Sequence, residues 1–354
     1  MIDQADLRAA VAAGILSEAQ VAALARLSSS RQEAQYAIAA GDEPFEVFQG
    51  FNEIFIVVGF GILVCGWSFV AALLFDFASG GLVRQFVIFS LVSAIPIWAA
   101  AEYFSRKRRM VAPSIVLSLL WAAISVLGFA AALSEPFMLG QQDYSSLPLP
   151  LAAATLSVLL FWWRFRVPFA LTLVAAGVFV VALLWTAVQV GNPLTARDFF
   201  LLSSNGPFAW VTLIVGLAVF TTAMFFDMSD PLRVSRRSAQ GFWLHIIAAP
   251  ALVNTVALSL ISQDTIIAHF LLFIILFLIA IVAIIIDRRS FLIAAAGYCV
   301  ALSLTVFDDL AAAYIFVILG FFLVVLGATW ERVRSTTLSI LGPALPLNRL
   351  PPAA

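Results

Sequence analysis

The chain has 354 residues, of which 63% are hydrophobic and only 11% are charged, and its mean hydropathy is +1.06. A soluble domain needs about a quarter charged residues, because apolar atoms cannot cover its whole surface without promoting association. The composition therefore excludes a set of soluble domains and predicts an integral membrane protein solvated by lipid. The 19 basic and 20 acidic residues nearly balance, and the basic ones form short clusters beside apolar runs, so nucleic-acid binding has no support.

Residues 1–50 are soluble in character and predict a small helical hairpin followed by a linker at the membrane interface. A first helix is expected over residues 3–13, and Gly14 breaks it. Ser17 and Gln20 then have the spacing of a capping box, in which each side chain bonds the backbone N–H of the other residue. The second helix places three apolar residues on one stripe: Val21, Leu24 and Leu27.

No cleavable signal peptide is evident, because the first residues are acidic where a signal would be basic. The aromatic stretch 44–51 is expected at the interface, and the first span, near Ile54, is expected to stay as an uncleaved anchor.

Ten apolar runs separated by short polar breaks predict an all-α helical bundle over residues 51–332. Most runs have a length that suits a hydrocarbon core about 30 Å thick at about 1.5 Å per residue. They are continuously apolar rather than alternating, which argues against strands. The expected spans are residues 54–75, 86–104, 111–134, 147–163, 167–190, 207–226, 242–263, 266–286, 291–307 and 310–330, followed by a short tail over 333–354.

The basic residues predict the orientation of these spans. With the N-terminus in the cytoplasm, every Lys and Arg falls on the cytoplasmic side except Arg84 and Arg197. This is the bias that the positive-inside rule describes, so both ends of the chain are expected in the cytoplasm. Several inner breaks also resemble one another, with basic residues followed at once by an apolar helix. Gene duplication and the shared demands of membrane insertion both explain that resemblance.

The sequence offers no cluster typical of an enzyme. His245 and His269 are expected on different spans near opposite membrane surfaces, so they cannot share a metal ion. Cys65 and Cys299 fall in the middle of different spans and are interpreted as small hydrophobic residues. Nucleotide-binding and hydrolase motifs are absent. We therefore expect no metal, no cofactor and no catalytic residues.

Polar residues inside a membrane are costly, so each one is a functional candidate. Glu102 is expected to pair with the basic cluster that follows it, and Glu53 to favour the positive end of the first spanning helix. Asp227 and Asp287 are interpreted as interfacial residues beside arginines. His245, about one turn from the inner interface, either bonds a carbonyl group or contributes to a site.

Three further residues complete the candidate set for a transport site. Asn254 is the most central polar side chain and either bridges two helices or faces a solute. Pro96 and Pro250 are the prolines well inside spans, the second and the seventh, which correspond in a five-plus-five inverted repeat. Interrupted helices in matching positions are typical of transporter sites. The absence of a central carboxylate for ion coupling argues against transport.

The segment from Ala10 to Leu24, AVAAGILSEAQVAAL, resembles the start of a bacterial family of membrane proteins called domain of unknown function 2157. The resemblance implies the same layout, a cytoplasmic hairpin before many spanning helices, and a place in the bacterial inner membrane. It implies no reaction and no catalytic residues. Ten helices with both ends inside also resemble the drug/metabolite transporter superfamily in topology alone.

Three functional hypotheses follow. The first is a non-enzymatic membrane protein whose residues 1–45 dock a cytoplasmic protein partner. The alternative is a permease for a small, weakly polar or lipid-like solute. A membrane enzyme acting on lipid is disfavoured, because no group of catalytic side chains is evident. A polar cavity that reaches the bilayer centre distinguishes the permease from the docking protein.

Overall fold

The structure is a computed structural model, and it describes residues 10–11, 13–17, 19–21, 23–24, 27, 51–74, 81–135, 145–191, 196–202, 206–263, 265–288, 300, 309–341 and 350–351. Within these residues every regular element is a helix, and nine helices are long and apolar enough to cross a membrane. This confirms the prediction of an all-helical, multi-pass membrane protein. The predicted span over residues 291–307 lies almost wholly outside the described residues.

The helices follow the predicted spans closely. In chain order they are α3 (Phe51–Leu74), α4 (Leu82–Ala101), α5 (Val111–Leu133), α7 (Pro148–Phe165), α8 (Pro168–Val190), α9 (Phe208–Ser229), α10 (Arg236–Ile261), α11 (Ile266–Ile285) and α13 (Asp309–Leu341). Two differences stand out. A π-helical turn over Glu102–Lys107 continues α4, and α13 runs on to Leu341 although its span was predicted to end at residue 330. The extension contains no glycine or proline, and the breakers Gly342 and Pro343 follow it directly.

The turn of the N-terminal hairpin is present as predicted. Gly14 has a φ of +71°, a conformation that glycine adopts at little cost. The backbone N–H of Ser17 donates to Oε1 of Gln20 at 2.8 Å, and the N–H of Gln20 donates to Oγ of Ser17 at 3.2 Å. These reciprocal bonds are the predicted capping box.

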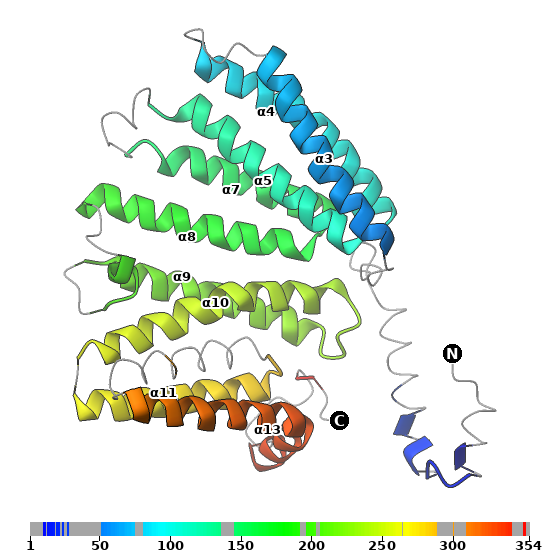
Figure 1. The fold of residues 1–354 in the computed structure, drawn as a ribbon, viewed down its shortest axis with the longest axis vertical. Coiled ribbons are helices and arrows are strands. Elements are labelled where there is room, and N and C mark those ends of the chain that lie inside the picture. Colours follow the sequence, from blue (N-terminus) through cyan, green and yellow to red (C-terminus); the bar gives the residue numbers. More distant parts are fainter. Residues whose placement is uncertain are drawn as a thin grey trace.

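The spanning helices form an extended row rather than a ring (Figure 1). The row runs from α3 and α4 at one end to α11 and α13 at the other. Most helices pack against their neighbours in the chain, but α3 packs against α5 and α8 also packs against α10. α10 lies near the middle, in contact with α8, α9 and α11, and it is the most buried of the spanning helices described.

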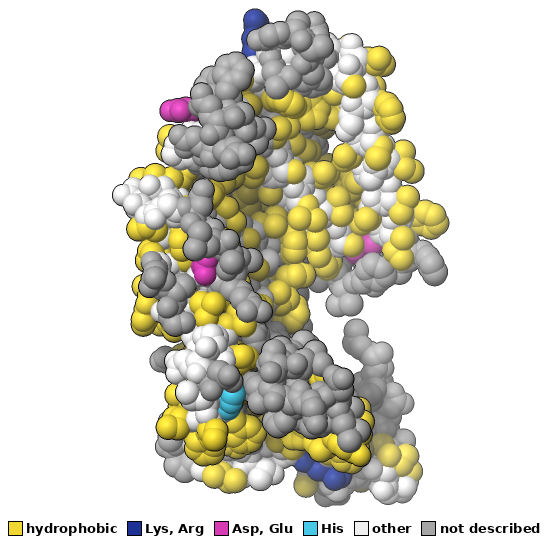
Figure 2. All heavy atoms as spheres, turned by 60° about the vertical axis from the view of Figure 1, so that its left-hand side comes forward, with side chains coloured by type: hydrophobic (Ala, Val, Ile, Leu, Met, Phe, Trp, Pro, Cys, Tyr) yellow, Lys and Arg dark blue, Asp and Glu magenta, His cyan; other side chains and the backbone are white. Residues whose placement is uncertain are grey.

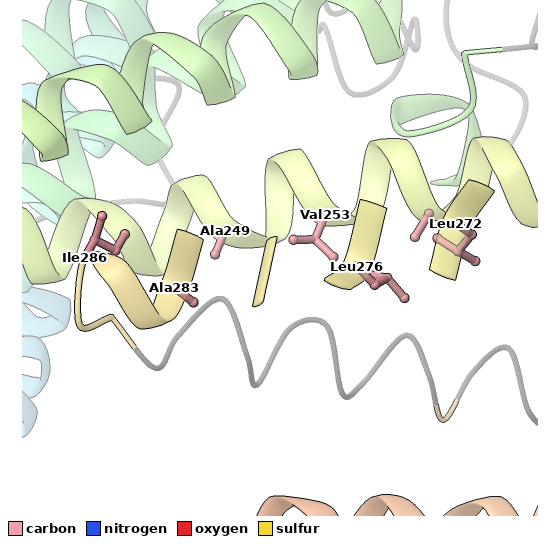
Figure 3. Close-up of a cluster of buried hydrophobic side chains, with 7 residues drawn as sticks. Ala249, Val253, Leu272, Leu276, Ala283 and Ile286 are labelled. Carbon is pink, nitrogen blue, oxygen red and sulfur yellow. The ribbon is translucent and has the colours of Figure 1, made fainter. Parts of the chain in front are cut away.

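The interior consists of several small clusters along the row. One lies among α4, α5, α7 and the start of α8, and a second among α8, α9 and α10. A third joins α10 to α11, where Ala249 and Val253 face Leu272, Leu276 and Ala283 (Figure 3). Alanines let the helix backbones approach closely, which is how helices associate where lipid supplies no hydrophobic drive.

Large apolar side chains cover much of the outer surface. Figure 2 shows them spread over the helices rather than gathered in one patch. Leu73 and Ile266 are 87% and 88% exposed. Soluble proteins avoid continuous apolar surfaces of this extent, so the described surface is suited to acyl chains.

Candidate functional site

The helix ends along one side of the row carry the turns where α4 meets α5, α7 meets α8 and α9 meets α10, together with the segment after α11. We call this side of the row the arginine-rich end. In the described residues, each of these four turns contains a non-glycine residue with positive φ, between 53° and 55°: Arg109, Arg166, Arg233 and Asp287. This backbone conformation costs about 1 kcal/mol or more outside glycine. The turns therefore share a backbone conformation as well as a basic composition.

A buried ionic network lies at this end, and we call Asp227, His245 and Arg288 the buried triad. His245 donates from Nε2 to Oδ2 of Asp227 at 2.9 Å. Arg288 donates from Nε to the same oxygen at 3.0 Å and from Nη2 to Oδ1. The bidentate contact between guanidinium and carboxylate is the strongest geometry for such a pair. All three residues are buried, and His245 has no solvent exposure.

Three different elements supply the triad. Asp227 lies in the last turn of α9, His245 in the third turn of α10, and Arg288 just beyond α11. Gly241, one turn before His245 in α10, lies against the carboxylate of Asp227. The close approach of α9 and α10 therefore depends on a residue without a side chain.

Aromatic rings and a carbonyl group complete the surroundings of the triad. The ring of Phe220 meets that of His245 edge to face at 5.5 Å between centroids. The guanidinium carbon of Arg288 lies 5.8 Å from the ring centroid of Phe242, and its Nη2 also donates to the carbonyl oxygen of Ser238 at 2.9 Å. The buried charges of Asp227 and Arg288 thus compensate each other in a largely apolar setting.

A second ion pair lies beside the triad, centred on Asp287. Arg233 donates from Nη1 to Oδ2 of Asp287 at 2.8 Å, and Trp330 of α13 donates to Oδ1 at 2.8 Å. Burial lowers the pKa of the Arg233 guanidinium, the nearby charge of Arg288 lowers it further, and Asp287 opposes both effects. Arginine remains protonated at neutral pH in spite of such a shift, so the pair stays ionic.

The turn between α9 and α10 is held by its own side chains. Asp230 accepts from the backbone N–H groups of Val234 and Ser235 at 3.1 and 2.9 Å. Ser235 in turn caps α10 by accepting from the N–H of Arg237. This turn places Arg236 so that its Nη1 donates to the carbonyl oxygen of Phe165 at the end of α7, at 3.2 Å.

The candidate residues predicted from the sequence lie in several places. Glu102 contacts Arg106 at 3.2 Å, the pairing with its own basic cluster that was predicted, and also Arg164 of α7 at 2.6 Å. Pro96 and Pro250 lie inside continuous helices, α4 and α10, and both are exposed.

Asn254 is half-buried in α10, whereas His245 is fully buried and belongs to the triad. The structure therefore does not gather the five candidates into one site.

The bonds from Asp227 to His245 and to Arg288 were not predicted from the sequence. Asp227 was interpreted as an interfacial residue because it ends its span beside arginines. A usable signal was present: Gly241 and His245 are four residues apart and share a helix face, just across a short turn from Asp227. Arg288 is 61 residues from Asp227, and only the tertiary fold brings the two together.

Among the described residues, no group of three or more His, Cys, Asp or Glu side chains is placed to hold a metal ion. No family model, no curated protein and no solved structure matches the chain.

Proposed function

We propose that the protein is a non-enzymatic permease of the bacterial inner membrane for a small, weakly polar or lipid-like solute. The supporting observation is the buried triad, which brings a carboxylate, an imidazole and a guanidinium group together where the ends of α9, α10 and α11 meet. Ionisable groups are expensive at such positions and generally mark solute or ion pathways. The argument against transport was the lack of a central carboxylate for ion coupling; Asp227 is a buried carboxylate, but it lies in the last turn of α9 rather than at its centre.

In this proposal the triad is a gate at the cytoplasmic end of the path. Asp227 joins α9 to α10 through His245 and to the end of α11 through Arg288. While these bonds are made, the three helix ends cannot separate. Opening requires the carboxylate to release at least one partner, and water or the solute must then replace it. A closed gate of this kind fits a permease in its resting state.

A cysteine-accessibility experiment tests the gate. Ala248 is fully buried and lies about one helical turn from His245 on the same face of α10. Ala248→Cys is made in a chain in which Cys65 and Cys299 are changed to Ala. Inside-out vesicles are then treated with a membrane-impermeant methanethiosulfonate. A permease exposes this position to water part of the time, so slow labelling is expected.

Adding Asp227→Asn should raise the labelling rate about ten- to a hundred-fold, because a charged hydrogen bond contributes about 1.5–3 kcal/mol to the closed state. His245→Gln provides a second, milder test of the same link. The control is Phe273→Cys, which is 66% exposed on the apolar surface of α11 and should stay unlabelled. If Ala248→Cys remains unlabelled with and without the gate substitutions, a permease working through the triad is excluded.

A second candidate is the docking protein, and the N-terminal hairpin favours it. Its turn is held by the capping box, while Ile15 and Leu24 are 75% and 44% exposed. Exposed apolar residues on a small hairpin suit a protein contact. Deleting residues 1–45 should then remove every co-purifying cytoplasmic protein. If those proteins are retained after the deletion and Ala248→Cys is labelled, the docking hypothesis is rejected and the permease hypothesis is supported.

The proposed orientation, with both ends of the chain in the cytoplasm, has a direct test as well. A reporter fused after Arg109 should lie in the cytoplasm, and one fused after Asp143 should lie outside it. Finding both reporters in the same compartment would reject this topology and the cytoplasmic position of the gate.

A further inference from the structure

A cavity of about 260 Å³ lies among α4, α5 and α7, away from the buried triad. It occupies the half of these helices that is remote from the arginine-rich end. Its walls include Ser90 and Ala94 of α4, Trp121, Ser125 and Gly128 of α5, and Ser157 of α7. A cavity of about 150 Å³ is enough to bind benzene in a protein core, so this one has room for a longer hydrocarbon segment.

Small residues create the space. Gly128 of α5 faces Ser90 of α4, and a Cβ at position 128 would lie 2.9 Å from Cβ of Ser90. The helices are therefore in contact there. Beside that contact, Ala94, Ser125 and Ser157 are too short to fill the gap, while Trp121 closes one wall.

The polar groups of the cavity fall into two sets. Trp121 donates from Nε1 to Oγ of Ser157 at 3.1 Å, and the hydroxyl groups of Ser157 and Ser125 lie 3.0 Å apart. These three groups therefore have hydrogen-bond partners within the cavity wall. Ser90 is different: the residue is 6% exposed, and its hydroxyl is buried without a hydrogen-bond partner. A buried, unbonded hydroxyl costs about 1–3 kcal/mol, so a ligand that hydrogen-bonds to Ser90 would remove this cost.

We propose that this cavity binds an uncharged amphiphile, a hydrocarbon chain with a hydroxyl or ester oxygen that bonds to Ser90. The apolar walls fit the chain, and Ser90 fits the oxygen. None of the described residues that line the cavity is charged, so a charged head group inside it would be unpaired and strongly disfavoured. The amphiphile is either a free long-chain alcohol or the ester region of a membrane lipid, whose charged head stays outside. This site is independent of the proposed gate.

Photolabelling of the full-length protein tests the site. The protein is reconstituted in phosphatidylcholine vesicles with one of three diazirine probes: hexadecanol, a phosphatidylcholine of equal chain length, or the oxygen-free alkane. Labelled residues are identified by mass spectrometry. We expect the alcohol or the phospholipid to label the walls, residues 87–94 and 121–132. The more efficient of the two identifies the source of the amphiphile.

Two substitutions define the result. Ala94→Phe fills the cavity and should abolish wall labelling by every probe. Ser90→Ala keeps the space but removes the hydroxyl, so labelling by the oxygen-bearing probe should fall about five-fold, the effect of one hydrogen bond of about 1 kcal/mol. Labelling by the alkane should not change with Ser90→Ala. The matched control is Ser118→Ala, a buried α5 serine outside the cavity whose hydroxyl donates to Ser114 at 2.7 Å.

The proposal is overturned if wall labelling survives Ala94→Phe in a folded protein. It is also overturned if Ser90→Ala weakens the alkane and the oxygen-bearing probe equally, since the hydroxyl would then have no specific role. If Ala94→Phe does not fold, the Ser90→Ala comparison decides alone. Neither readout involves the triad, so loss of the gate hypothesis would leave this result intact.

Discussion

Gly241 of α10 lies directly against the carboxylate of Asp227 in α9. A Cβ at position 241 would lie 2.9 Å from Cγ of Asp227, nearer than such atoms approach in folded proteins, and 3.2 Å from the carbonyl oxygen of Ala223. The carboxylate of Asp227 therefore occupies the space that a side chain at position 241 would need. The helix contact and the buried triad depend on each other, because any side chain at this position displaces the group that both His245 and Arg288 bind.

Gly241→Ala should consequently destabilise the protein although alanine favours helices. Moving the carboxylate weakens the buried pair with Arg288, and breaking such a pair costs about 3–5 kcal/mol, against a gain of about 0.5–1 kcal/mol in helix propensity. The midpoint of thermal unfolding in detergent micelles measures the difference. Gly59→Ala in α3 is the matched control, since a Cβ there meets nothing within 4 Å and its midpoint should stay level or rise. Equal effects at the two glycines would contradict the close contact.

The charges of the triad should behave as a unit. Asp227→Ala leaves the guanidinium of Arg288 buried without its carboxylate, and we expect a loss of about 3–5 kcal/mol in the free energy of unfolding. Changing Arg288 to Met as well removes the unpaired charge, so the double variant should recover much of that loss. A double-mutant cycle in detergent gives the coupling energy. Additive losses at the two positions would show that they do not interact.

Sequence patterns that act over a few residues predicted most of the helices. They could not predict the buried triad, whose residues are far apart in the chain. Span positions follow from runs of apolar residues, and the hairpin turn follows from Gly14, Ser17 and Gln20, because these features act within a few residues. The triad requires Arg288 to meet Asp227, 61 residues earlier, and no local pattern encodes that contact. Basic residues near Asp227 in the chain suggested an interfacial position, but burial among packed helices decides its environment.

Two glutamates near helix ends should contribute very differently to stability. Glu53 of α3 is 1% exposed and accepts from the backbone N–H of Ala112 at 2.9 Å. This N–H lies in the first turn of α5, where it has no partner within its own helix, so Glu53 supplies its acceptor. Glu53→Ala should cost about 1–3 kcal/mol, because the N–H is left buried without its acceptor. The free energy of unfolding in detergent is the measurement.

Glu102 provides the comparison for Glu53. Its side chain is 32% exposed and its partners Arg106 and Arg164 are 59% and 32% exposed, so solvent screens these pairs. Glu102→Ala should therefore cost no more than about 1 kcal/mol, and the cost should shrink as salt is added. A larger loss at Glu102 than at Glu53 would reverse this ranking and refute the assignment of Glu53 as the cap of α5.

The contact between α7 and α8 offers a test of packing without charges. Gly177 of α8 faces Thr155 of α7, and a Cβ at position 177 would lie 2.9 Å from Cγ2 of Thr155. Gly177→Ala should cost about 1–3 kcal/mol through overpacking, measured as a lower thermal midpoint. Thr155 donates its hydroxyl to Leu151 within its own helix, so Thr155→Ala frees space without leaving a buried donor unpaired. The double variant should therefore be more stable than Gly177→Ala alone. If adding Thr155→Ala gives no recovery, the helices do not meet at these two residues.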